Sequence, residues 1–192
     1  MRVSKTYKTI AIAVSLGMAI LATTVYSATT NILAVGTIPN SQMVNGTATV
    51  TVRTLTIAPG EVLNWHYHPG YAFNVVKSGS LTVEDGCGGE DETLSPGESF
   101  EEMDGRVHRA KNLTNADVVV YNTFLVPQGK PTTVNIPNNE RRCGPPENVD
   151  ECRDGGWLKF NHPFSFTSQG QCISFIRLSP RNTIPVPEDP LN

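Results

Sequence analysis

Histidines are the side chains in this sequence whose spacing best suits chemistry. Three of the four fall in one strand-rich region, as His66, His68 and His108. Residues i and i+2 of a β-strand project from the same face about 6.5–7 Å apart, so His66 and His68 can both face inward and bind one ion at about 2.1 Å per nitrogen. His108 would join them from another strand. We predict a three-imidazole metal site; the alternative is that the first two histidines point outward from an edge strand.

Two neighbouring carboxylates precede His108 in the chain. Successive strand residues alternate between faces, so one of Glu101 and Glu102 should point inward, and we favour Glu102. This carboxylate could bind the metal directly, or act as a base that holds a water or a histidine ligand. The alternative is that both glutamates are solvated at the rim of the site.

Three further side chains are candidates for contacting a substrate. Asn64 lies two residues before His66 and therefore shares its face, and Tyr71 lies in the Pro-Gly turn after the paired histidines. Arg106 could bind an anionic substrate, or it could pair with the acidic side chains near it in the sequence. We expect Asn64 and Tyr71 at the mouth of the metal site, and all three as candidate substrate contacts.

Short strands must position these residues. Residues 47–57 alternate small polar and apolar side chains, which is typical of a strand with one buried face. Further strands, separated by Gly and Pro turns, are predicted over residues 61–67, 73–77, 81–83, 99–103, 108–112 and 117–126. No helical periodicity appears in this region. We therefore predict an all-β sandwich or barrel.

Two stretches of the chain resemble the two motifs of the cupin superfamily. The first motif, G-x5-H-x-H-x3-E-x6-G, is similar to GEVLNWHYHPGYAFNVVKSG at Gly60, His66, His68 and Gly79. The second, G-x5-P-x-G-x2-H-x3-N, is similar to GESFEEMDGRVHRAKN at Gly97, Gly105, His108 and Asn112. The resemblance implies a cupin-type double-stranded β-helix (jelly-roll) barrel over residues 45–127, with a divalent metal in its open mouth held by the motif histidines.

Two positions depart from these motifs. The glutamate ligand of the family falls on Ala72, and its proline falls on Met103. The site therefore resembles that of the three-His cupins, which implies Fe, Zn, Ni, Cu or Mn with open positions for water and substrate. Imidazole alone does not choose among these metals.

The resemblance leaves three functions open, because one fold carries many different sites. The first is a metal-dependent oxidoreductase of the dioxygenase type that acts on a small organic molecule. The second is a non-enzymatic module that binds a small molecule or a metal, which the lack of a clear general base favours. The third is a structural cupin that keeps its histidines without metal. Cupins are often dimers, so a homodimer is also implied.

The first 27 residues have the layout of a signal peptide. Three basic residues precede 13 mostly apolar ones, Ile10 to Ala22, fewer than the roughly 18–20 that a membrane-spanning helix needs. We predict cleavage near Ser27 and a secreted or periplasmic protein without stable membrane insertion; the alternative is an uncleaved anchor. The remaining chain is acidic and has no long basic run, so we expect no nucleic-acid partner.

Residues 128–192 are predicted to form an irregular C-terminal extension that holds three of the four cysteines. An even number of cysteines in an exported protein favours disulfides. We prefer the pairs Cys87–Cys143 and Cys152–Cys172, because the first would tie the extension to the barrel; a local Cys143–Cys152 pair is the alternative. Residues 164–166 and 173–175 resemble a hairpin. The proline-rich stretch 179–192 is predicted to be an extended tail.

Overall fold

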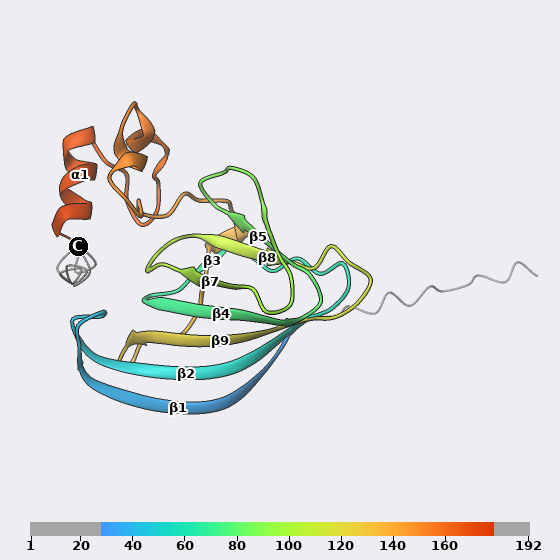
Figure 1. Ribbon diagram of the computed structural model, residues 1–192. Coiled ribbons are helices and arrows are strands. Elements are labelled where there is room, and N and C mark those ends of the chain that lie inside the picture. The colour runs from blue at the N-terminus through green and yellow to red at the C-terminus, as the bar shows by residue number, and fades with distance from the viewer. Residues whose placement is uncertain (1–27, 179–192) are drawn as a thin grey trace, which may run out of the picture.

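Two five-stranded antiparallel sheets face each other in the computed structural model, which describes residues 28–178 (Figure 1). The first sheet contains, in spatial order, β1 (Thr29–Ser41), β2 (Gly46–Ile57), β9 (Val118–Pro127), β4 (Tyr71–Ser78) and β7 (Ser99–Glu102). The second contains β10 (Val134–Asn135), β3 (His66–Tyr67), β8 (His108–Lys111), β5 (Leu81–Asp85) and β6 (Glu92–Leu94). This architecture confirms the predicted all-β jelly-roll fold. The predicted signal peptide and proline-rich tail lie outside the described residues.

The inner faces of the strands follow the predicted period of two. In β2, three of the four odd-numbered residues from 51 to 57 are buried, whereas the even-numbered ones between them are half-buried. The cluster of buried aliphatic side chains between the sheets consists of Leu55, Ile57, Val76, Leu81, Leu94, Ala110, Val118 and Val120. Burying each large side chain stabilises the fold by about 1.5–3 kcal/mol. None of the histidines belongs to this cluster, so we expect the barrel to fold without a metal.

The largest differences between the predicted and the observed strands lie at the edges of the two sheets and around β3. Strand β1, which was not predicted, precedes residue 45 and pairs with β2 along its whole length. The predicted strand 61–67 contracts to two residues, with an isolated bridge at Val62. A turn at Pro69 and Gly70 follows; a β-carbon on Gly70 would lie 2.3 Å from the Leu125 carbonyl oxygen, so only glycine allows β4 to begin this close to β9.

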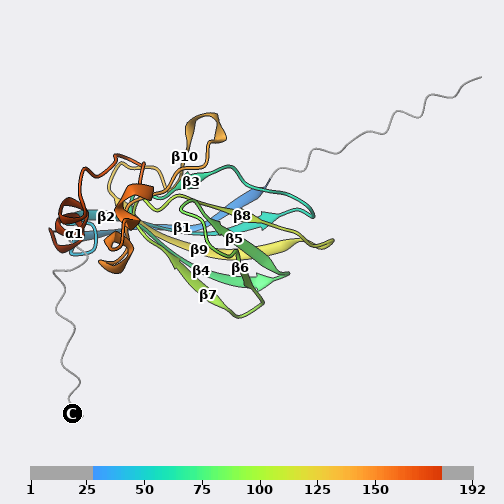
Figure 2. The same cartoon turned by 90° about the horizontal axis from the view of Figure 1, so that it is seen from above.

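The C-terminal extension adds an edge strand to the second sheet and ends in a small hydrophobic core of its own. Strand β10 joins the second sheet beside β3. Three short 3₁₀ helices, η1 (Pro137–Asn139), η2 (Asp150–Cys152) and η3 (Gly156–Lys159), and the helix α1 (Gln169–Leu178) complete the described extension. Figures 1 and 2 both show the part around α1 to one side of the sheets. No helix among residues 28–178 is long and apolar enough to cross a membrane.

Both preferred disulfides are present, Cys87–Cys143 and Cys152–Cys172. The first joins the β5–β6 loop to the extension, and the second joins η2 to α1. The predicted hairpin over residues 164–166 and 173–175 is wrong, because the second segment belongs to α1. Cys172 and Ile176 lie four residues apart on one face of α1 and are buried against the aromatic side chains of the extension. The apolar residues of this segment therefore form the buried face of a helix, which packs on a loop.

Candidate metal centre

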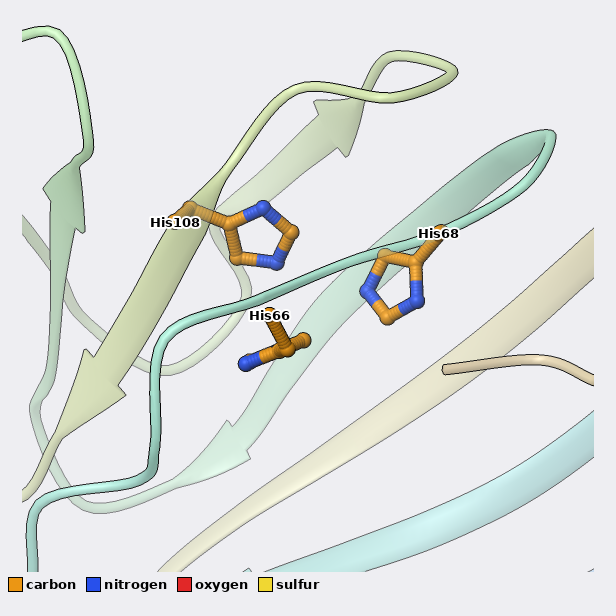
Figure 3. Close-up of side chains that lie close together, drawn as sticks. All are labelled: His66, His68 and His108. Atoms are coloured by element: carbon orange, nitrogen blue, oxygen red, sulfur yellow. The ribbon is translucent and has the colours of Figure 1, made fainter. Parts of the chain in front are cut away.

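The three histidines of the predicted site lie together between the two sheets (Figure 3). His66 on β3 is directly paired with His108 on β8, and His68 directly follows β3. All three are buried, with 2–8% of each residue exposed. Their ring centroids are 4.4–5.2 Å apart, and one ring nitrogen of each lies within 4.8 Å of the other two. The structure therefore brings together the three imidazoles that the sequence singles out.

Backbone carbonyl groups fix which nitrogen of each ring is free. The Nδ1 atom lies 2.7 Å from the Asn64 carbonyl oxygen in His66, 2.5 Å from that of Thr132 in His68, and 3.0 Å from that of Arg106 in His108. A carbonyl oxygen can only accept, so each Nδ1 donates its hydrogen, and in a neutral ring the lone pair then resides on Nε2. All three rings thus present the same atom to a cation.

Glu102 supplies the carboxylate of the site. Its Oε2 lies 3.1 Å from His68 Nε2 and its Oε1 lies 2.9 Å from His108 Nε2. Burial would raise the pKa of Glu102, but the two imidazoles outweigh it and hold this pKa well below its usual range. Burial likewise opposes the charge on His108, and the Glu102 carboxylate overcomes it and raises the pKa of that imidazole. The site therefore contains a carboxylate in its charged form.

The position of Glu102 explains how the site can lack the motif glutamate. Ala72, where that glutamate falls, is the direct cross-strand partner of Glu102 in the β4–β7 pair. Paired residues of an antiparallel ladder project from the same face with their β-carbons about 4.5–5.5 Å apart. A carboxylate thus reaches the histidines from β7 in place of β4.

The donor set fits a divalent transition metal. Burial, together with the neighbouring His108 and His68, lowers the pKa of His66 to about 3, so this imidazole is neutral at physiological pH. His108 Nε2 is buried without a hydrogen bond of acceptable geometry, despite its proximity to Glu102, and it is the only such side-chain atom within residues 28–178. Imidazole nitrogens beside one carboxylate suit Fe, Zn, Ni, Cu and Mn, and a bound cation would replace any proton on His108 Nε2 and satisfy this orphaned nitrogen.

A line of hydrogen bonds crosses the inner face of the first sheet and ends on Glu102. Arg53 Nε donates to Asn122 Oδ1 (3.1 Å), Asn122 Nδ2 donates to Asn74 Oδ1 (2.7 Å), and Asn74 Nδ2 donates to Glu102 Oε2 (3.0 Å). Because a guanidinium only donates and a carboxylate only accepts, the line has one direction and fixes both amide orientations. We call these four residues the polar ladder.

A cavity of about 520 Å³ adjoins the centre. Its polar lining includes His66, His68 and Glu102 together with Asn64, one of the predicted substrate contacts. The apolar lining consists of Ala28, Leu55, Val62, Leu63, Leu81, Phe100, Ala110, Val120 and Phe124. A volume of this size is typical of sites for small organic molecules.

The other two predicted substrate contacts lie away from this cavity. Tyr71 is buried in an apolar cluster with Ala48 and Leu125. Arg106 is buried among the carboxylates of Asp85, Glu147 and Glu151, at N–O distances of 2.7, 3.7 and 3.0 Å. Neither residue lines the cavity of about 520 Å³, but Arg106 lines a second cavity, of about 320 Å³, together with His108 and Glu102. Arg106 also links the barrel to the extension, and its partners are other than the acidic neighbours in the sequence.

Replacing Arg106 with methionine is expected to destabilise the protein by about 3 kcal/mol, because a buried ion pair loses one partner while its carboxylates remain. This value is at the low end of the usual range, since the carboxylates keep contact with water. Chemical denaturation of the variant measures the change. The exposed Arg153–Asp150 pair provides the control, and Arg153→Met should change the free energy of unfolding by less than about 0.5 kcal/mol. An equal change in both variants would contradict the linking role.

Several site residues were missed by the sequence analysis. Arg53, Asn74 and Asn122 occupy the inward-facing positions of their strands, so polar residues in the buried phase of an alternating pattern were the available signal. The Thr132 carbonyl group accepts a hydrogen bond from His68, although Thr132 follows the predicted barrel in the sequence. No local sequence pattern indicates this contact. The extension therefore takes part in building the site.

Comparison with known proteins gives one family. Residues 53–124 match the family model described as a cupin domain. Solved structures that resemble the chain include a cupin superfamily protein from Desulfitobacterium hafniense, at 13% identity over 53% of this chain and 79% of that chain, with a TM-score of 0.41. Oxalate oxidase in complex with glycolate aligns at 23% identity over 46% of each chain, with a TM-score of 0.40.

A third structure is a DMSP lyase from Ruegeria pomeroyi, at 15% identity over 47% of this chain and 45% of that chain, with a TM-score of 0.42. The aligned regions thus span less than half of the oxalate oxidase and lyase chains. A search of curated proteins found no match.

Proposed function

This chain belongs to the cupin superfamily, and from that premise we propose that it is a metal-binding cupin in which His66, His68, His108 and Glu102 hold one divalent transition metal. The observation that carries the proposal is the common orientation of the three rings. Each Nδ1 lies within hydrogen-bonding distance of a backbone carbonyl, which leaves Nε2 as the nitrogen of each ring that can bind a metal, and two of these Nε2 atoms lie within 3.1 Å of the half-buried Glu102 carboxylate. Purely structural histidines would not need this shared arrangement.

We further propose that the site is that of an oxidoreductase of the dioxygenase type acting on a small organic molecule. A bound transition metal would supply Lewis-acid and redox chemistry at its open positions. The chain itself provides the carbonyl groups that orient the rings, Asn74 to orient the Glu102 carboxylate, and the apolar side chains that form part of the cavity wall. Asn64 lines the cavity beside His66 and is proposed to contact the substrate.

Oxygen consumption tests this activity against the alternative of a non-enzymatic binding module. Wild-type protein is loaded with each of Fe, Zn, Ni, Cu and Mn and screened with small organic substrates in an oxygen electrode. A dioxygenase should consume oxygen with one metal, lose all turnover on chelation, and regain it when that metal returns. Ligand binding without product under every condition would favour the binding module.

We also propose that the protein acts outside the cytoplasm, as a secreted or periplasmic protein. The two disulfides support this location. The predicted signal peptide supports it independently.

A homodimer is proposed on the basis of strand β1. Ile32, Leu33, Val35 and Ile38 are 42–63% exposed on this edge strand, and an exposed apolar edge is prone to pairing. Light scattering after size exclusion should give a dimer for the wild type and a monomer for Val35→Glu. The matched control is Leu113→Glu, which alters an equally exposed residue in a loop and should remain dimeric. A monomeric wild type would refute the dimer.

A further inference from the structure

Arg53 is a cation that lines the cavity without an acidic partner. Among residues 28–178, the salt bridges of this chain include none with Arg53, so no carboxylate oxygen lies within 4 Å of its guanidinium nitrogens. Burial lowers the pKa of Arg53, although the Glu102 charge opposes this effect. By contrast, Arg106 is surrounded by three carboxylates. The charge of Arg53 is thus partly desolvated and lacks a compensating ion pair.

The orientation of this guanidinium is fixed on one side only. Its Nε donates to Asn122 at the start of the polar ladder, and its central carbon lies 4.6 Å from the centroid of the Phe124 ring. Its two terminal amino groups make no hydrogen bond with residues 28–178. Arg53 therefore lines the cavity with two coplanar N–H donor groups that have no hydrogen-bond partner among residues 28–178. Such a pair of donors matches the two oxygens of a carboxylate.

The other charged groups of the cavity are already engaged. Glu61 accepts hydrogen bonds from the backbone amides of Ala28 and Ala58, and Glu102 contacts His68 and His108. The remaining wall contains nine aliphatic or aromatic residues, and neutral polar residues such as Asn64 and Thr133 make up the rest. The cavity thus combines a guanidinium that has no ion-pair partner in the described part of the chain with a partly apolar wall and the histidine centre.

We propose that Arg53 is the anion-binding residue of this cavity and that its ligand is a small organic acid with an apolar body. The carboxylate binds the guanidinium, and the body lies against the Leu55, Leu63 and Phe100 part of the wall. This inference rests on the proposed function in one respect, because it assumes that the cavity beside the metal centre is the substrate site. It adds the chemical class of the substrate.

Benzoate and benzamide are matched probes, since they share size and shape and differ in charge. Calorimetric titration of the purified, disulfide-bonded protein should show that benzoate binds at least about tenfold more tightly than benzamide, as expected for a hydrogen bond between charged groups. Arg53→Gln, which keeps a donor for Asn122 but loses the charge, should abolish this preference. Arg53→Lys, which keeps the charge but loses the fork, should retain part of it.

The titrations are run on metal-free and Zn-loaded protein, and metal content is measured for every variant. An unchanged preference for benzoate in Arg53→Gln would overturn the inference, as would benzoate binding that needs zinc and ignores Arg53. A wild type that holds no metal but binds benzoate through Arg53 would refute the proposed function and leave the anion site standing. If Arg53→Gln fails to fold, the test rests on the Arg53→Lys protein. Its benzoate affinity should be several-fold lower than that of the wild type, and its benzamide affinity should be the same.

Discussion

Protein with both His66 and His68 replaced by alanine is expected to contain less than about 0.1 metal per chain, against about one in the wild type. The double variant keeps only His108 and Glu102, too few ligands to hold a transition metal in a buried site. It should remain folded, because the aliphatic cluster between the sheets lies apart from the histidines. Metal content is measured by inductively coupled plasma mass spectrometry on protein that was exported to an oxidising compartment and purified without a His-tag.

The fourth histidine provides the matched control for this experiment. His162 lies in the extension, where its ring contacts Tyr67, and it is not part of the histidine group. His162→Ala should therefore retain about one metal per chain. Equal metal content in the double variant and the wild type would place the metal elsewhere in the protein.

Replacing Glu102 with alanine is expected to weaken metal affinity by at least about tenfold, the usual effect of losing a group that binds or orients metal ligands. The carboxylate contacts two of the three imidazoles and offsets the charge of the cation. Competition with a chromophoric chelator measures the affinity. Glu101→Gln, which alters the exposed neighbouring carboxylate on the same strand, should leave the affinity unchanged.

A second substitution tests whether the carboxylate has moved between strands. Ala72 and Glu102 are cross-strand partners, so adding Ala72→Glu to Glu102→Ala should return the affinity to within a few-fold of the wild type. Glu102→Ala with wild-type affinity would show that the carboxylate takes no part in metal binding. If Glu102→Ala weakens metal affinity and the added Ala72→Glu does not restore it in a folded protein, then β4 cannot present a carboxylate to these rings.

The histidine group was predictable because its signal is local. Two histidines separated by one residue, and a third at the motif distance, needed only strand alternation and the family spacing. The same alternation predicted that one of Glu101 and Glu102 points inward, but it did not by itself choose between them. Arg53, Asn74 and Asn122 carried the same signal, since each occupies the buried phase of a strand, but their mutual contacts depend on the order of β2, β9 and β4 in the sheet.

Other features depend on contacts that no local pattern records. The exposed strand β1 lacks an inward phase, so alternation cannot reveal it. Thr132 reaches His68 only because β10 returns to pair with β3. Arg106 was predicted to bind an anionic substrate from its place beside His108, and in the structure its charge is balanced by acidic residues of β5 and the extension. Sequence proximity did not reveal which acidic side chains pair with Arg106, and its contact with a substrate stays a prediction.

X-ray absorption fine structure at the absorption edge of the bound metal tests the central claim most directly. We expect the metal to be surrounded by three imidazole nitrogens and at least one oxygen at about 2.0–2.2 Å, with one imidazole fewer in His108→Ala. A first shell made of oxygen alone, a shell that contains sulfur, or an imidazole count unaffected by His108→Ala would contradict it.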